Sequence, residues 1–200
     1  MRGAVCAHRG VVALRHTVCA LLAREVTSMQ TMTVKFTEAD YMNLPEGFPA
    51  QLVNGMLVKE TAPRPWHQTL LSRIHAQLLE QLPPDRALFS PIDVFIDEFN
   101  VFQPDVCLLP AGAEPGPATE RVEKPVIVIE VLSPTTKRID RFTKTDIYLR
   151  AGIREVWLVD PDQRRIEVFS KKAHVSVAAG EVVSRAVGVR LDIDRLFRVT

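Results

Sequence analysis

The sequence lacks the marks of a secreted, membrane-spanning or nucleic-acid-coating protein. It has three cysteines in 200 residues, Cys6, Cys19 and Cys107, and no C-x-x-C pattern. Neither a disulfide framework nor a cysteine metal site is expected, and we predict a cytoplasmic protein. No apolar run approaches the roughly 20 residues of a membrane-spanning helix, so no membrane partner is predicted. Lys and Arg number 25 against 24 Asp and Glu, and a net charge of +1 excludes the global field of a DNA-coating protein.

The composition is that of a globular protein, with 46% apolar and 24% charged residues. The N-terminus differs from the rest: four arginines and no acid precede Glu25. We predict that residues 1–31 are an extension outside the fold, disordered or loosely docked, and that residues 32–200 form a single domain. A targeting segment is the alternative, although Arg15 and His16 interrupt the apolar stretch that a signal peptide needs.

In the first half of the domain, the spacing of apolar residues predicts a short helix, a hairpin and a long amphipathic helix, followed by strands. Asn54-Gly55 is the strongest hairpin signal, because both central residues of a type I′ turn need positive φ. The expected elements are a helix over 37–44, a hairpin over 51–58, a helix over 66–82, strands over 88–96 and 101–109, and a Pro/Gly-rich loop over 110–120.

The sequence of the second half of the domain predicts the central strands of a sheet. Residues 125–132 are almost wholly apolar and largely β-branched, which is typical of a strand buried on both faces. A helix over 137–151, closed by Gly152, leads to a strand over 155–159, and this order implies a parallel pair with a right-handed crossover. The remaining expected elements are a strand over 165–170 that pairs back as a hairpin, edge strands over 175–183 and 187–191, and a short helix over 191–197. The predicted class is α/β (α+β), with a central mixed sheet flanked by helices.

Glu130 is the one charge inside the buried strand, and a buried carboxylate is costly unless it is paired or binds a metal. Asp105 follows a proline on its own strand. If the two strands are neighbours, the carboxylates of Asp105 and Glu130 converge and suit a hard cation such as Mg²⁺, with Mn²⁺ as an alternative. A lysine nearby could stabilise charge on phosphate oxygens. The alternative is structural: Glu130 paired with an Arg or Lys of the core.

A longer series of motifs resembles the Uma-two family of restriction endonucleases, a branch of the PD-(D/E)xK nucleases. The similarity runs from about Thr33 to Phe169. It is carried by Gln103-Pro104-Asp105, by Val128-Ile129-Glu130 through Ser133-Pro134, by Asp140, Lys144 and Tyr148, and by Ala151-Gly152 through Trp157 to Asp160-Pro161. The resemblance implies a restriction-endonuclease-like fold and Mg²⁺-dependent endonuclease cleavage of phosphodiester bonds, with nucleic acid, DNA favoured, as partner.

The resemblance also implies roles for individual residues. Asp105 and Glu130 match the two metal-binding acids. The lysine that usually lies two residues after the second acid is absent, because position 132 is Leu132, and the resemblance moves this role to Lys144 on the following helix. Asp140 lies four residues before Lys144 and could share its helix face. The alternative for Lys144 is a plain surface ion pair with Asp140.

Three further features leave the function open. Gln51 stands where the family often has a glutamate; its amide could orient water or bind phosphate but carries no charge. His67, at the start of the long helix, is either a site-edge group or an ordinary polar residue of a helix start. The cluster Lys137, Arg138 and Arg141 is either a phosphate-binding patch or a solvated face. A catalytically degenerate nucleic-acid-binding module of the same fold is therefore the alternative function. A homodimer through the edge strands is a further expectation.

Overall fold

The computed structural model describes residues 34–113, 116 and 121–199. The predicted extension over 1–31 lies outside these residues, as does part of the loop expected over 110–120. The elements below all belong to one compact unit that begins at Lys35. No helix of the described residues is both long enough and apolar enough to cross a membrane.

The domain begins with the predicted helix and hairpin. Helix α2 (Glu38–Met42) starts with a capping box, in which the Thr37 hydroxyl accepts from the Asp40 N–H and the Asp40 carboxylate accepts from the Thr37 N–H. Strands β1 (Ala50–Val53) and β2 (Met56–Lys59) pair antiparallel. They are joined by Asn54 at φ 50° and Gly55 at φ 79°, so the predicted type of turn is confirmed.

The two strands predicted over 88–96 and 101–109 are wrong as single elements, because each is divided between two sheets. The observed strands are β3 (Leu88–Phe89), β4 (Val94–Asp97), β5 (Asn100–Phe102) and β6 (Val106–Leu108). Strands β4 and β5 join the hairpin in a four-stranded sheet of order β2-β1-β5-β4, whereas β3 and β6 belong to the larger sheet. Both interruptions contain a proline, Pro91 and Pro104, which has no N–H to donate to a ladder.

The six-stranded sheet has the order β10-β9-β8-β7-β6-β3 and is mixed, as predicted. Its centre is β7 (Ile127–Val131), which runs parallel to β8 (Glu155–Asp160). Strands β9 (Arg165–Ser170) and β10 (Ala173–Val177) continue the sheet antiparallel. The crossover helix ends at Gly152, whose φ of 99° is the left-handed conformation that favours glycine. Its first part is a π-helical segment, η2 (Ile139–Lys144), and only its second part is α-helical, α4 (Thr145–Ala151).

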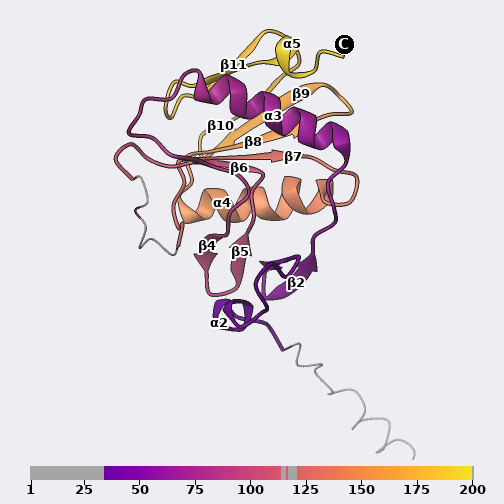
Figure 1. Cartoon of the computed structure of the whole chain (residues 1–200), viewed down its shortest axis with the longest axis vertical. Helices are drawn as coiled ribbons and strands as arrows, with labels where there is room; N and C mark the ends of the chain where they lie inside the picture. Colours follow the sequence, from indigo (N-terminus) through magenta and orange to yellow (C-terminus); the bar gives the residue numbers. More distant parts are fainter. Residues whose placement is uncertain (1–33, 114–115, 117–120, 200) are drawn as a thin grey trace, which may run out of the picture. The chain divides into compact units, whose positions relative to one another are not determined.

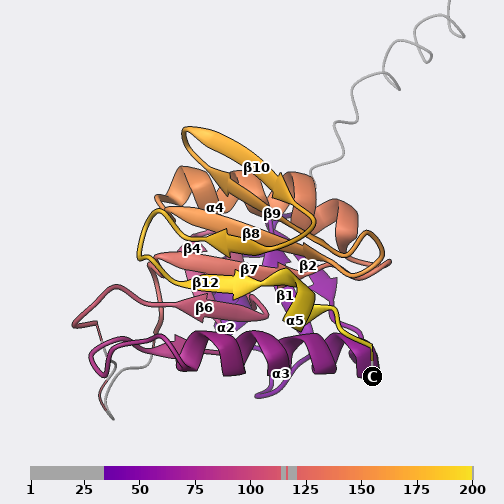
Figure 2. The same cartoon turned by 90° about the horizontal axis from the view of Figure 1, so that it is seen from above.

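Helices cover both faces of this sheet (Figures 1 and 2). Helix α3 (Pro65–Leu79) packs on the face that carries Ile127, Ile129 and Val131. Helix α4 packs on the opposite face, where Val128 belongs to its core cluster. Because side chains alternate along a strand, Glu130 points to the α4 side. This alternation decides which helix supplies its partner.

The C-terminal segment lies beside α3 and shares its core cluster on the same face of the six-stranded sheet (Figure 2). It contains β11 (Glu181–Val183), β12 (Arg190–Asp192) and α5 (Ile193–Leu196). The strand predicted over 175–183 is interrupted at Gly180, which has a φ of 75°, so it forms the end of β10 and a separate β11. The short C-terminal helix is confirmed. The β11–β12 hairpin is a third sheet, separate from the six-stranded one.

Candidate active site

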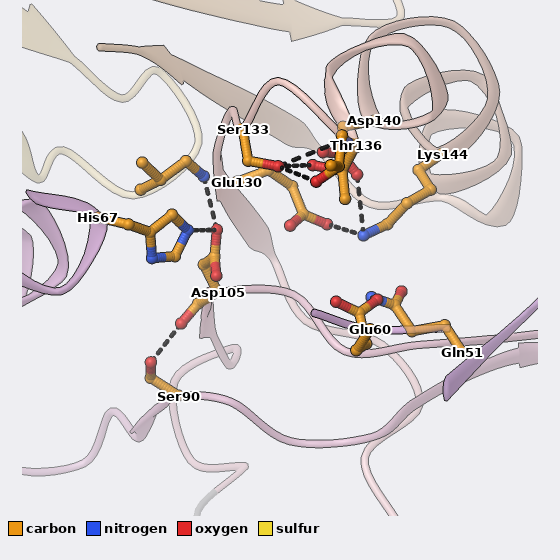
Figure 3. A network of polar contacts seen from close by, with 12 residues as sticks. Gln51, Glu60, His67, Ser90, Asp105, Glu130, Ser133, Thr136, Asp140 and Lys144 are labelled. Carbon is orange, nitrogen blue, oxygen red and sulfur yellow. Dashed lines mark hydrogen bonds and ion pairs between the residues drawn. The ribbon is translucent and has the colours of Figure 1, made fainter. Parts of the chain in front are cut away.

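The structure brings Asp105 and Glu130 together at one end of the central strand (Figure 3). Strands β6 and β7 are antiparallel neighbours with Val106 opposite Ile129. The same register, continued by one residue, places Asp105 beside Glu130. The carboxylate oxygen Oδ2 of Asp105 accepts a hydrogen bond of 2.7 Å from the Val131 N–H. The predicted convergence of the two carboxylates therefore follows from strand pairing.

Glu130 is 3% exposed and is paired with the predicted lysine. Lys144 Nζ lies 2.6 Å from Glu130 Oε1, and the Tyr148 hydroxyl donates to the same oxygen at 3.0 Å. Lys144 Nζ also lies 3.3 Å from Asp140 Oδ1. Two predictions are therefore met by Lys144. It is the core residue that pairs with Glu130, and it is also the lysine expected at the site. The alternative of a plain surface pair between Asp140 and Lys144 is wrong, because both are buried.

Burial and neighbouring charge set the protonation of this pair. Burial raises the pKa of Glu130 to about 8, although Lys144 acts in the opposite direction. Burial alone would lower the pKa of Lys144, but the carboxylates of Glu130 and Asp140 outweigh it and hold that pKa above its ordinary value. Lys144 is consequently a fixed positive charge at neutral pH.

His67, in the first turn of α3, closes the other side of the site. Its Nε2 lies 3.2 Å from Asp105 Oδ2. This hydrogen bond raises the pKa of His67, against the lowering effect of its burial. The interpretation of His67 as a group at the site edge therefore fits the geometry better than that of a simple helix-start residue.

The β1–β2 hairpin adds two polar side chains from the smaller sheet. The Gln51 amide donates a hydrogen bond to the carboxylate of Glu60, which directly follows β2. In Figure 3 both groups point toward the ammonium of Lys144. Burial raises the pKa of Glu60, and the charge of Lys144 opposes that rise. Sequence reasoning missed Glu60; the signal was the hairpin itself, which folds β2 back onto the strand of Gln51.

Two of the three cations of the predicted phosphate-binding patch are paired with carboxylates of the protein. Lys137 Nζ lies 3.1 Å from Asp160 Oδ2, and Arg141 Nη2 lies 2.7 Å from Glu167 Oε1. Both acids are buried, so these cations serve an ion-pair network over β8 and β9. This leaves Arg138 as the one member of the cluster without an ion pair to a described residue.

The donor set of the site suits a divalent cation with few protein ligands. The contacts above occupy Oδ2 of Asp105 and Oε1 of Glu130, and no hydrogen bond from a described residue reaches Asp105 Oδ1 or Glu130 Oε2. In the described part of the chain, no three His, Cys, Asp or Glu side chains are grouped so that they could hold a metal ion. Mg²⁺ is typically held by one or two carboxylates and keeps several waters, so two free carboxylate oxygens fit it.

A mixed sheet between helices, with two acids and a lysine meeting beside the end of β7, is the arrangement that the family resemblance implies. Residues 38–194 match the family Uma2, described as "Putative restriction endonuclease". The chain belongs to this family.

Among solved structures, the chain is similar to a crystal structure from Anabaena variabilis described as a "putative nuclease belonging to DUF820". The TM-score is 0.70 at 19% sequence identity, with 81% of this chain and 97% of that chain covered. At this identity the likeness shows the fold. The comparison with curated proteins found no match.

Proposed function

We propose that this protein is a Mg²⁺-dependent endonuclease that hydrolyses phosphodiester bonds of nucleic acid, with DNA as the favoured substrate. The observation that carries the proposal is the meeting of Asp105, Glu130 and Lys144 at the end of β7. Membership of a restriction-endonuclease family supports the substrate class. The two carboxylates keep Mn²⁺ as an alternative cation. The cytoplasm stays the expected compartment, because the cysteine spacing predicts no disulfide framework.

Asp105 and Glu130 are the residues that would hold the cation, through the oxygens to which no described residue donates a hydrogen bond. When bound, Mg²⁺ activates water and offsets negative charge on phosphate. Hydrogen bonds from the chain's own groups hold the two carboxylates in position. His67 and the Val131 N–H fix the carboxylate of Asp105, and Tyr148 fixes that of Glu130. Such supporting hydrogen bonds orient ligands before the cation arrives.

Lys144 contributes positive charge rather than a base. Its raised pKa keeps the ammonium protonated, and its position against Glu130 places that charge at the site. Preorganised positive charge stabilises the negative charge that builds up on phosphate oxygens in the transition state. Asp140 limits the movement of the ammonium from its other side.

A homodimer remains part of the proposal. Strand β10 is the outer strand of the six-stranded sheet and offers an open edge for pairing. Size-exclusion chromatography with light scattering tests this element separately from the chemistry.

The test compares Glu130→Gln with a matched control on the neighbouring strand. Glu155 is also buried, at 4% exposed, but its carboxylate accepts from Trp157 and from backbone N–H groups away from the site. We expect the wild type and Glu155→Gln to bind Mg²⁺ in calorimetry and to cleave DNA with it. Glu130→Gln should remain folded and lose both properties.

Cleavage that persists in purified Glu130→Gln would refute the cation site. A folded wild type that binds nucleic acid without binding Mg²⁺ or Mn²⁺ would favour the degenerate binding module instead. Parallel assays on DNA and RNA decide the substrate.

A further inference from the structure

Glu60 is an acid of the site that the proposed function does not yet use. Its side chain is half-buried, and it comes from the four-stranded sheet rather than from the sheet that carries Asp105 and Glu130. The Glu60 N–H donates to the Pro49 carbonyl, which extends the β1–β2 ladder beyond Lys59. The backbone of Glu60 is therefore fixed, and its carboxylate reaches the site from a defined position.

Gln51 gives an independent sign that this corner takes a ligand. It is 6% exposed, and its amide nitrogen donates to Glu60. Its amide oxygen is buried and has no hydrogen-bond partner among the described residues. A buried acceptor without a donor costs free energy and calls for an explanation. In Figure 3 the amide of Gln51 is turned, with the carboxylate of Glu60, toward the Lys144 side of the site.

The charges around Glu60 are those of the cation site. Lys144 attracts the carboxylate, whereas Asp140 and Asp105 repel it. A carboxylate held close to other acids is unfavourable by itself. A divalent cation between the acids would turn this repulsion into attraction. The orphaned oxygen of Gln51 would also gain a partner, either the cation or one of the waters around it.

We propose that Glu60 supplies the third negative charge of the cation site and that Gln51 holds it in place. The inference rests on the proposed function and adds a residue to its site. Because Mg²⁺ keeps several of its own waters, Glu60 can act on the cation through water without standing as close as a direct ligand. The charge that is absent at position 51 is thus present across the hairpin.

The test measures cation affinity rather than cleavage alone. Calorimetry with Mg²⁺ and with Mn²⁺ compares the wild type, Glu60→Gln, and the exchange variant Gln51→Glu/Glu60→Gln. Loss of a supporting group of this kind typically lowers metal affinity about 10- to 100-fold, and we expect this for Glu60→Gln. The exchange variant keeps a carboxylate–amide pair with the charge moved to the other strand, and it should regain most of the affinity. Glu98→Gln removes the same charge from an exposed turn and should bind like the wild type.

Circular dichroism verifies that each variant is folded. If Glu60→Gln binds the cation like Glu98→Gln, the inference is overturned and the proposed function stands. If the exchange variant binds no better than Glu60→Gln, Glu60 acts as a structural residue and the inference is also overturned. If the folded wild type binds neither cation, the proposed function fails and the inference fails with it.

Discussion

Replacing Lys144 by methionine should reveal how strongly the buried charges depend on one another. Lys144 and Glu130 are each 3% exposed. The substitution keeps a side chain of similar length and removes the ammonium. Two carboxylates, Glu130 and Asp140, then face each other in a buried space without a cation.

The size of the effect can be worked from the distances. At an effective dielectric constant of about 20, a separation of 2.6 Å corresponds to an attraction of about 6 kcal/mol, and 3.3 Å to about 5 kcal/mol. Desolvation of each ion offsets several kcal/mol of this. Removal of one partner from a buried pair typically costs about 3–5 kcal/mol, and we expect Lys144→Met to lower the free energy of unfolding by that amount.

The loss should depend on pH in a defined direction. Burial already raises the pKa of Glu130 to about 8, and removal of Lys144 raises it further. The folded variant then holds a proton that the unfolded chain releases above its ordinary carboxyl pKa, so stability falls as the pH rises. The difference between variant and wild type should therefore be larger near pH 9 than near pH 6.

Urea denaturation followed by circular dichroism at both pH values measures this difference. The double variant Glu130→Gln/Lys144→Met removes both charges and should recover much of the stability. The exposed pair of Arg150 with Asp146, at 2.8 Å, is the matched control, and Arg150→Met should cost about 1 kcal/mol or less. Equal losses at pH 6 and pH 9, or a double variant no more stable than Lys144→Met, would refute the reasoning.

Two further predictions concern groups outside this pair. Burial would raise the pKa of Asp160, but Lys137 and the backbone N–H groups of Asp162 and Gln163 hold it below the ordinary 3.8. Burial would likewise raise the pKa of Glu167, but Arg141 and Arg165 hold it below the ordinary 4.5. These interactions therefore stabilise the fold above the ordinary values, and their contribution is lost as the pH falls through the lower folded-state values. Arg141→Met should therefore lower the melting temperature at pH 7 more than at pH 3; equal shifts would contradict the interpretation. Burial raises the pKa of the Cys107 thiol to about 12, so iodoacetamide at pH 8 should leave Cys107 unmodified in native protein and modify it in urea, as peptide mass spectrometry can show. Modification of the native thiol would contradict its burial.

Much of the fold could be predicted because local patterns and long-range packing agree. Asn54-Gly55 marked the first hairpin, and the apolar run around Glu130 marked the central strand. The strands around Pro91 and Pro104 could not be assigned to two sheets, because alternation of apolar residues reports which face a side chain occupies and not which sheet a strand joins. A proline inside each predicted strand was the available warning.

For the site, too, some residues could be predicted from the sequence and others could not. Asp105 and Glu130 were recognisable because a charge in or beside a buried strand needs a partner. Lys144 could be assigned only through the family resemblance, since nothing in the local spacing showed that its helix packs against the face that carries Glu130. Glu60 escaped prediction because its role depends on the docking of one sheet against another, which no local pattern encodes.

Because two sheets supply the residues of the site, local unfolding of one sheet would affect the site without unfolding the other. Proteins unfold locally in cooperative units whose free energies range from near zero to the global value. An excursion that detaches only the β1–β2 hairpin would carry Gln51 and Glu60 away while the Glu130–Lys144 pair stayed intact. Hydrogen exchange at the amide of Leu52, compared with that of Ile129 in β7, would measure the two openings separately. The population with a complete site would then be set by the less stable sheet, without unfolding of the domain.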